Sequence, residues 1–415
     1  MIRIISKFTK ACLNGIILLC IKENYMDNYI NLFKKIYNTE NKYEAFCPYR
    51  VCPVGAHSDH QYGFVTGFAI DKGIHVLYNI NDDNKVIVSS INFDGTEEFI
   101  IDELKEKRDC WADYVMGATK VLYDEYKITK GITALIIGTM PIGGLSSSAA
   151  VIMSFMKALC NANNLSLTKE QVIKLALKVE NNFIGISVGT LDQSCEMYCK
   201  KNHLLYLDTK DGSYELIPQN KNMPEYEICV LFSGVQRTLV GSAFNMRVDE
   251  LKSAAYALMA FADMPYGKFN DARLRDVPYQ VFLEHKDKLP ANWRKRATHY
   301  YTEMNRVERM KDAWSEGNLE EVGKIMFESG DSSIYNYETG SDELKTLSEI
   351  CHNIKGIYGG RFSGAGFKGC YVAIINPKYK EEIKKEATKM YLKKFPEYKD
   401  KFEVIFCKTA DGCNF

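Results

Sequence analysis

The sequence has no excess of charge of either sign. Its 53 Lys and Arg residues equal its 53 Asp and Glu residues. A chain without a net positive field has no general means of attracting nucleic acid or an anionic membrane. We therefore expect neither as a partner, and recognition has to come from a local site.

Paired cysteine motifs are also missing, although the chain has 13 cysteines. No CxxC pair occurs, and Cys195 and Cys199, four residues apart, are followed by no second pair. Structural zinc sites and disulfide frameworks both need such pairing. Scattered cysteines are typical of reduced thiols that act as small apolar residues, so we predict a cytoplasmic protein.

The chain also lacks a membrane-spanning segment of adequate length. The apolar residues 11–21 follow a basic stretch, residues 1–10, and imitate a signal peptide. The run is shorter than the ~20 residues that a spanning helix needs, and no small-residue cleavage site follows it. We predict that residues 1–25 are an N-terminal extension outside the native structure and that an amphipathic stretch follows from Met26.

What is present is an ordinary globular composition, with 46% apolar and 26% charged residues. A chain of 415 residues is longer than one hydrophobic core usually serves. Strand-like and helix-like segments are mixed along it, which predicts an α+β fold with two sheets, each backed by helices. The polar segment 208–224 is the candidate linker, and we predict domains over residues 26–214 and 215–415.

The main chemical signal is the segment PIGGLSSSAA at residues 141–150. Its two glycines allow the backbone to approach a ligand closely, and its serines open a predicted helix, residues 146–160. The free N–H groups at a helix start favour anions, and neighbouring hydroxyls suit phosphate and Mg²⁺. The segment is not a Walker A loop, because no GK[ST] follows the glycines. Taken alone, it is better explained as a glycine turn with serine caps.

Three further segments carry groups that sugar and phosphate ligands need. Residues 50–63 join an arginine, a carboxylate and two histidines, and metal binding by these side chains is the alternative. Residues 360–369 place glycines after a predicted strand, which indicates a loop over a phosphate. Asp192 lies in apolar company and is a candidate general base, with a turn or a helix cap as the alternative.

Together the four segments resemble the GHMP kinase superfamily and, within it, the galactokinase branch. Residues 50–63 are similar to the galactokinase signature GRxNLIGEHxDYxxG, residues 141–150 to PxxxGLSSSA, residues 361–370 to RxTGAGxGGC, and residues 189–193 to GxxDQ. The resemblance runs in the same order from about residue 46 to residue 370. It implies a two-domain α+β GHMP kinase fold, with a ribosomal protein S5 domain 2-like N-terminal domain and a ferredoxin-like C-terminal domain.

The resemblance also implies roles for individual residues. Asp192 is expected to take the proton of the anomeric hydroxyl, Arg50 to stabilise the transferring phosphoryl group, and Ser148 and Glu180 to hold Mg²⁺. The expected substrate-binding residues are Arg50, Ala56, His57, Asp59, Gly189, Asp192, Gln193 and Phe244. The expected ATP-binding residues are Gly143, Gly144, Leu145, Ser146, Ser147, Ser148, Gly364, Ala365 and Gly366.

Departures from the galactokinase pattern point to the substrate. Galactokinases carry Glu where this chain has Ala56, and Tyr where it has His60 and Phe244. In the family the glutamate binds the sugar's 6-hydroxyl. Its absence suits a carboxylate at C6, because two facing carboxylates repel each other. Residues 47–61 also resemble the plant-type galacturonokinases, which read PYRxCPLGxHxDHQ.

We therefore predict an ATP-dependent sugar 1-kinase that converts D-galacturonate and ATP to galacturonate 1-phosphate and ADP. Galactokinase is the first alternative. A galactokinase-like sugar-sensing regulator with weak catalysis is an alternative of another class, against which Arg50, Asp192 and the intact serine run count. The expected partner is a small sugar or uronic acid, with ATP and Mg²⁺ as cofactors, and the sequence favours neither a monomer nor a homo-oligomer.

Overall fold

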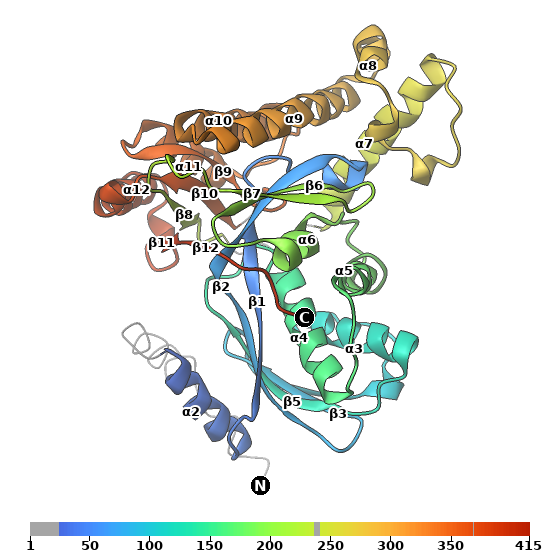
Figure 1. Ribbon diagram of the computed structural model, residues 1–415, viewed down its shortest axis with the longest axis vertical. Coiled ribbons are helices and arrows are strands. Elements are labelled where there is room, and N and C mark those ends of the chain that lie inside the picture. Colours follow the sequence, from blue (N-terminus) through green and yellow to red (C-terminus); the bar gives the residue numbers. More distant parts are fainter. Residues whose placement is uncertain (1–24, 236–240, 368) are drawn as a thin grey trace.

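A computed structural model describes residues 25–235, 241–367 and 369–415. The predicted N-terminal extension lies outside the described residues except for Tyr25. The described chain forms two β-sheets with helices packed against them (Figure 1), which confirms the predicted α+β fold. Within the described ranges, no helix is both long enough and apolar enough to cross a membrane.

The first sheet is built around one long strand, β2 (Phe64–Ile80). The strand order is β4-β3-β5-β2-β6-β7, and β1 and β12 also pair with β2. Of the pairs within this sheet, β3 with β5 is parallel and the others are antiparallel. The other strands are β1 (Tyr43–Val51), β3 (Lys85–Ser90), β4 (Thr96–Ile100), β5 (Ile132–Gly138), β6 (His203–Asp208), β7 (Tyr214–Pro218) and β12 (Thr409–Ala410).

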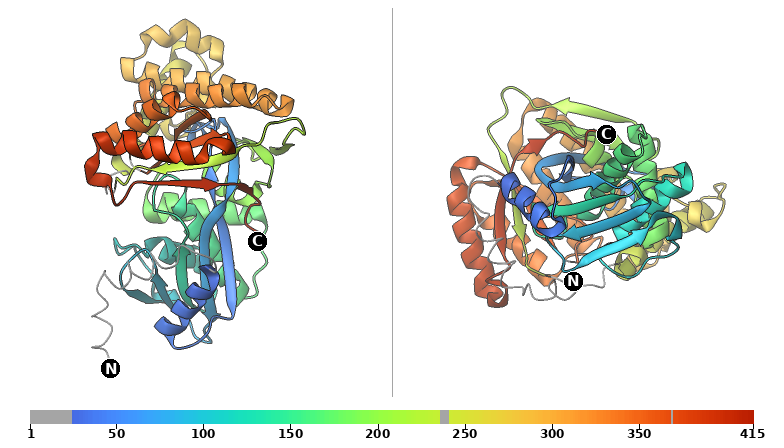
Figure 2. Two further views of the ribbon diagram at one scale, coloured as in Figure 1. Left: turned by 90° about the vertical axis from the view of Figure 1, so that its left-hand side faces the viewer. Right: turned by 90° about the horizontal axis from the view of Figure 1, so that it is seen from below.

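Helices cover both faces of this sheet (Figure 2). Successive side chains of a strand point to opposite faces, so Val76 of β2 enters the main core while its neighbour Leu77 packs beneath Phe33 of α2 (Tyr25–Tyr37). The predicted amphipathic stretch after Met26 is this helix. The main core is covered by α3 (Asp113–Tyr126), α4 (Ser147–Ala162), α5 (Lys169–Lys178) and α6 (Leu191–Tyr198).

The second sheet has the order β11-β8-β10-β9 and is antiparallel throughout. One face packs on α11 (Asp342–Asn353) and α12 (Lys380–Lys394), and the other faces α9 (Ala291–Glu316) and α10 (Leu319–Tyr335). Helices α7 (Gly241–Phe261) and α8 (Tyr279–His285) form a further cluster with α9. The strands are β8 (Glu227–Phe232), β9 (Ile357–Phe362), β10 (Cys370–Ile375) and β11 (Glu403–Cys407).

The candidate linker differs from its prediction, because it contains β7, which pairs with β6. Only Ile217 of this edge strand is buried, so the alternating apolar pattern that marks a strand is missing. β7 belongs to the first sheet and β8 to the second, and the predicted boundary between residues 214 and 215 remains a prediction.

The described cysteines are free thiols, and all except Cys110 are buried.

A close contact between two backbones fixes α10 on β9. A Cβ atom built on Gly359 would lie 1.8 Å from the carbonyl oxygen of Gly323. A methyl group does not fit there, because the obstructing atoms are backbone atoms that cannot rotate away. The contact brings α10 directly against the strand, so that Ser329 and Ser333 reach the side chain of Arg361.

We expect Gly359→Ala to lower the free energy of unfolding by about 3 kcal/mol, because the added methyl group separates α10 from β9. Urea denaturation measures this change. The matched control is Gly267→Ala, where a Cβ atom would meet nothing within 4 Å. The control should stay within about 0.5 kcal/mol of the unmodified chain. Equal midpoints for the two variants would contradict the close contact.

Candidate active site

Arg50 connects the four motif segments. It lies in β1 directly after a register shift at Pro48, and it is buried. Its Nε donates to Oδ1 of Asp192 at 2.8 Å. Its Nη1 donates to the carbonyl oxygen of Gly144 at 3.0 Å and to Oγ of Ser363 at 3.2 Å. Each partner belongs to a different motif segment, so the structure brings the four segments together in one place.

The loop before α4 is shaped by glycines. Gly143 and Gly144 have φ values of 136° and 85°, and a Cβ on Gly144 would lie 2.9 Å from the carbonyl oxygen of Ser363. The loop therefore packs backbone to backbone against Ser363, Gly364 and Gly369 of the third motif segment. α4 begins at Ser147, and the hydroxyl of Ser146 makes no capping bond and is buried without a partner among the described residues. A free hydroxyl beside free helix N–H groups suits the oxygens of a phosphate.

A cavity of about 300 Å³ opens at this loop. We call it the larger cavity, in comparison with an adjoining cavity described below. Part of its wall is formed by polar side chains and by the glycine loops, namely by Arg50, Gly143, Gly144, Ser146, Ser147, Ser148, Asp192, Gly364 and Ala365. The rest is largely apolar and aromatic, with Tyr49, Phe93, Trp111, Tyr114 and Ile142. The rings of Phe93 and Trp111 are parallel, with an interplanar angle of 2°. The cavity thus combines groups for phosphates with flat apolar surfaces for an aromatic base.

A second cavity of about 200 Å³, the smaller cavity, shares Arg50, Ser148 and Asp192 with the larger one. It extends to the loop after β1 and is also lined by Ala56, His57, Asp59, Glu180, Gly189, Phe244 and Arg361. Asp192 therefore stands in the wall common to both cavities. A group held in the larger cavity can be transferred there to a molecule held in the smaller one.

Three predicted site residues lie outside the walls of both cavities, namely Leu145, Gln193 and Gly366. Gln193 is fully buried, and its side-chain amide donates to Glu180. The carbonyl oxygen of Leu145 accepts from the backbone N–H of Arg50, and that of Gly366 accepts from Gly340 and Ser341. These three residues support the walls and do not form them.

The sequence did not mark the aromatic wall of the larger cavity or Arg361 as a ligand-facing residue. Phe93, Trp111 and Tyr114 come from a loop after β3 and from the start of α3, and no common motif joins them. Arg361 was visible as the first residue of the third motif. Its burial and its place beside Ala56 become apparent only in the structure.

Buried carboxyl groups line the smaller cavity. Burial, followed by the charge of Asp192, raises the pKa of Asp59 to about 6 and that of Glu180 to about 8. Oγ of Ser148 donates to Oε1 of Glu180 at 2.9 Å. Among the described residues no cationic side chain forms an ion pair with Glu180. A buried carboxylate of this kind, next to a hydroxyl, is an arrangement that a divalent cation would complete.

Three histidines are buried beside the smaller cavity. The ring of His57 stacks on Tyr337 at 4.3 Å, and Nε2 of His60 lies 3.3 Å from the hydroxyl of Tyr337. Nε2 of His299 lies 3.1 Å from the carbonyl oxygen of Ala56. Burial lowers the pKa of His60 to about 3 and that of His299 to about 4. Within the part of the chain that the structure describes, no three His, Cys, Asp or Glu side chains form a group that could hold a metal ion.

The chain matches one protein family over both halves. Residues 113–200 match the GHMP kinases N terminal domain, and residues 310–393 match the GHMP kinases C terminal domain. The sequence is 34% identical over 390 residues to a galacturonokinase from Arabidopsis thaliana, across 88% of this chain and 91% of that protein. The chain is a GHMP kinase. It is an ATP-using sugar kinase of the galactokinase and galacturonokinase type, a phosphotransferase with an alcohol group as acceptor.

Galactokinases resemble this GHMP kinase almost as strongly. A galactokinase from Staphylococcus carnosus is 33% identical over 365 residues, across 86% of this chain and 92% of that protein. The crystal structure of Lactococcus lactis galactokinase complexed with galactose matches with a TM-score of 0.85 at 27% identity, over 94% of this chain and 100% of that one. The match confirms the predicted two-domain GHMP kinase fold. Identities of 34% and 33% do not select a substrate, so the choice rests on the residues of the smaller cavity.

We expect the acid stability of the kinase to depend on His60. Below pH ~6.5 the unfolded chain takes up a proton at this residue, whereas the folded chain does so only near pH 3. The free energy of unfolding therefore falls as the pH drops through this window. In His60→Gln the fall should be shallower by about 1.4 kcal/mol per pH unit between pH 6 and pH 4.

Urea denaturation at several pH values between 7 and 4 measures this slope. The control is Tyr337→Phe, which removes the hydroxyl beside His60 without removing the titrating group. It should lower stability at every pH and leave the slope unchanged. A His60→Gln slope equal to that of the unmodified kinase would contradict the assignment.

Proposed function

We propose that this kinase transfers the γ-phosphoryl group of ATP to the anomeric hydroxyl of D-galacturonate, which forms galacturonate 1-phosphate and ADP. The observation that carries the proposal is Ala56. Its methyl group lies in the wall of the smaller cavity beside His57 and Arg361, at the position where the galactokinase signature has a glutamate. A C6 carboxylate would be repelled by that glutamate and is accepted by the alanine.

ATP occupies the larger cavity in this proposal. The backbone N–H groups after Gly143 and the free hydroxyl of Ser146 receive the phosphates, and the nucleobase lies among Phe93, Trp111 and Tyr114. Gly364 and Ala365 complete the wall over the transferred phosphoryl group. Leu145 and Gly366 hold these loops in place through their carbonyl oxygens.

Asp192 is the proposed base. It stands in the wall common to both cavities, where it can take the proton of the anomeric hydroxyl while that oxygen attacks phosphorus. The guanidinium of Arg50 donates to Asp192 at 2.8 Å, which orients the carboxylate, and it stabilises negative charge on the phosphoryl group. Phosphoryl transfer depends mostly on such positioning and charge stabilisation.

Ser148 and Glu180 are the proposed Mg²⁺ ligands, and Gln193 orients Glu180 through its amide. When bound, Mg²⁺ neutralises charge on the phosphates. The residues fit Mg²⁺ because Glu180 is a buried carboxyl group beside the hydroxyl of Ser148 and has no cationic partner among the described residues, so a cation would stabilise its ionised form. Ser148 supplies a neutral oxygen on the same side.

The sugar is held in the smaller cavity by Asp59, whose carboxylate accepts hydrogen bonds from vicinal hydroxyls. Gly189 permits this position, since a Cβ there would lie 2.5 Å from Oδ2 of Asp59. Phe244 offers an apolar edge and contacts the ring of His60 edge to face at 5.9 Å. His57 also lines this cavity.

Galactokinase is the second candidate. The near-equal identities to a galacturonokinase and to galactokinases favour it as an alternative, as does the TM-score of 0.85 to the galactose complex. A sugar-sensing regulator is disfavoured, because sensing does not require the buried pair of Arg50 and Asp192. Substrate tests separate the first two candidates.

We expect Asp192→Asn to keep sugar binding and to lower kcat by about 10²- to 10⁴-fold, because asparagine cannot take the proton. Calorimetric titration measures binding, and ADP release measures turnover. Asp124→Asn, on the outer surface of α3, is the control and should keep normal turnover. A near-normal rate for Asp192→Asn would remove this residue as the base.

We expect the kinase to prefer galacturonate to galactose in kcat/KM, and Ala56→Glu to shift that preference toward galactose by about tenfold or more. ADP release with galacturonate, glucuronate, galactose, glucose and N-acetylgalactosamine measures the preference. Ala56→Gln is the control, because it adds nearly the same volume without charge. Equal or better turnover of galactose by the unmodified kinase would overturn the proposed substrate.

A further inference from the structure

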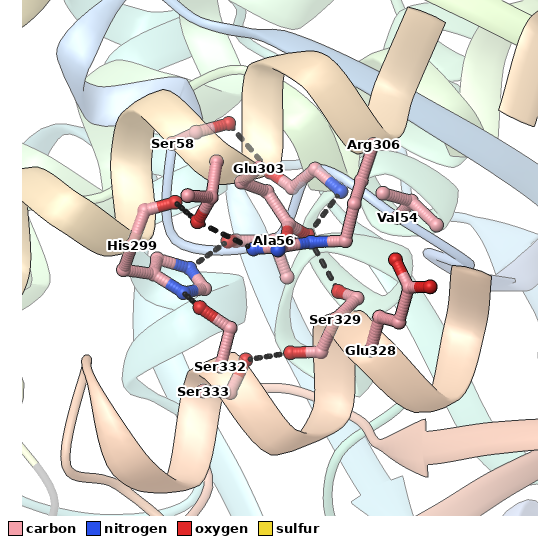
Figure 3. Close-up of polar contacts among 12 residues, drawn as sticks. Val54, Ala56, Ser58, His299, Glu303, Arg306, Glu328, Ser329, Ser332 and Ser333 are labelled. Atoms are coloured by element: carbon pink, nitrogen blue, oxygen red, sulfur yellow. Dashed lines mark hydrogen bonds and ion pairs between the residues drawn. The ribbon is translucent and has the colours of Figure 1, made fainter. Parts of the chain in front are cut away.

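Two buried arginines share one carboxylate beneath Ala56. Glu303 of α9 is fully buried and pairs with Nε of Arg306 at 2.7 Å and with Nη1 of Arg361 at 3.4 Å. In the described part of the chain, no other carboxylate lies within ion-pair distance of either guanidinium. Figure 3 shows Glu303 and Arg306 next to Ala56. Two positive charges and one negative charge are thus buried together, which leaves one positive charge without a counter-ion.

The unbalanced charge is that of Arg361. Oε2 of Glu303 accepts from Arg306, while Oε1 already accepts from the N–H of Gly55 at 2.7 Å and from Oγ of Ser329 at 2.6 Å. The 3.4 Å contact to Arg361 is the longest of the four. Burial opposes ionisation of Glu303, but its cationic surroundings, Arg306 first, outweigh burial and lower its pKa to about 2. Glu303 therefore carries one full negative charge, and its nearest cationic partner is Arg306.

Neutral oxygens hold Arg361 in place. Its guanidinium donates to Oγ of Ser329 at 2.7 Å, to Oγ of Ser333 at 3.0 Å and to the carbonyl oxygen of Phe362 at 3.2 Å. The residue is 1% exposed, so water does not screen its charge. A buried cation held mostly by neutral acceptors is costly, and an anion placed nearby offsets the cost.

His57 gives a second, independent indication of a ligand at this place. It is buried, and its Nε2 has no hydrogen-bond partner among the described residues. Buried polar atoms are nearly always partnered in folded proteins. His57, Arg361 and Ala56 line the same cavity, so a ligand there meets an unpartnered imidazole and an uncompensated guanidinium together.

The charges of the smaller cavity fix the orientation of a uronic acid. Asp192 lies on the side of the phosphate loop, where the reacting hydroxyl has to be, and it needs a partner that can donate a proton, which a carboxylate cannot do. Arg361 lies on the side of Ala56 and attracts one. Only the orientation with the carboxylate over Ala56 satisfies both conditions.

We infer that Arg361, which the galactokinase motif shares, selects a uronic acid in this chain because position 56 carries no glutamate: its uncompensated charge, together with the imidazole of His57, receives the C6 carboxylate in the space over Ala56. The inference rests on the proposed function. With the carboxylate bound, Arg306 and Arg361 face two negative charges. Bound galactose leaves the guanidinium of Arg361 without a counter-ion, which disfavours the neutral sugar.

The test compares galacturonate with galacturonamide, which has nearly the same shape and no charge. For the unmodified kinase we expect kcat/KM to favour the acid by about tenfold or more. In Arg361→Gln this ratio should fall to near one. Arg309→Gln, on the same side of the fold but paired with Glu321 and Glu328, should keep the original ratio.

Ser333→Ala is a milder variant that removes one hydrogen bond from Arg361 and keeps its charge. It should keep the preference for the acid, and it provides a test if Arg361→Gln fails to fold, as thermal unfolding will show. Loss of the preference in Ser333→Ala, or equal kcat/KM values for acid and amide in the unmodified kinase, would overturn the inference. An unchanged ratio in folded Arg361→Gln would do the same. Turnover of galactose without turnover of either uronic compound would instead overturn the proposed function.

Discussion

The active site depends on the ion pair between the buried Arg50 and the partly exposed Asp192, which joins residues 142 positions apart in the sequence. An unpaired charge at the depth of Arg50 costs several kcal/mol, so β1 and α6 have to meet for this arginine to be tolerated. Nη1 of Arg50 donates to the carbonyl oxygen of Gly144 and to Oγ of Ser363, which positions both glycine loops. One guanidinium thus orders the base, the phosphate loop and the loop above it at the same time.

Much of the fold could be predicted from local patterns. The helix predicted over residues 146–160 is α4, and the amphipathic stretch predicted after Met26 is α2. The edge strand β7 has one buried residue and α6 has only eight residues, so neither leaves a reliable periodic signal. Their formation depends on neighbours that are distant in sequence, which no local pattern contains.

The same distinction applies to the site. Residues of contiguous motifs, such as Asp59 and Asp192, could be assigned to one cavity before its shape was known. The wall of Phe93 and Trp111 could not, because its members lie in separate elements. The sequence also could not show that the charge of Arg361 is poorly compensated. That depends on Glu303, 58 residues away, and on which donors this carboxylate binds.

The contact between the backbones of Gly323 and Gly359 limits how this protein can evolve. Arg361 lies in β9 two residues after Gly359, where the strand is pressed against α10 without intervening side chains, so this part of the wall of the smaller cavity is rigid. Mutations there disturb the packing of a whole helix before they alter the cavity. Ala56 lines the same cavity from the loop after β1 and Phe244 lines it from α7, and neither residue belongs to this backbone contact. New sugar preferences in this lineage are therefore expected to arise by substitution at residues such as Ala56 and Phe244, while the contact between α10 and β9 stays unchanged.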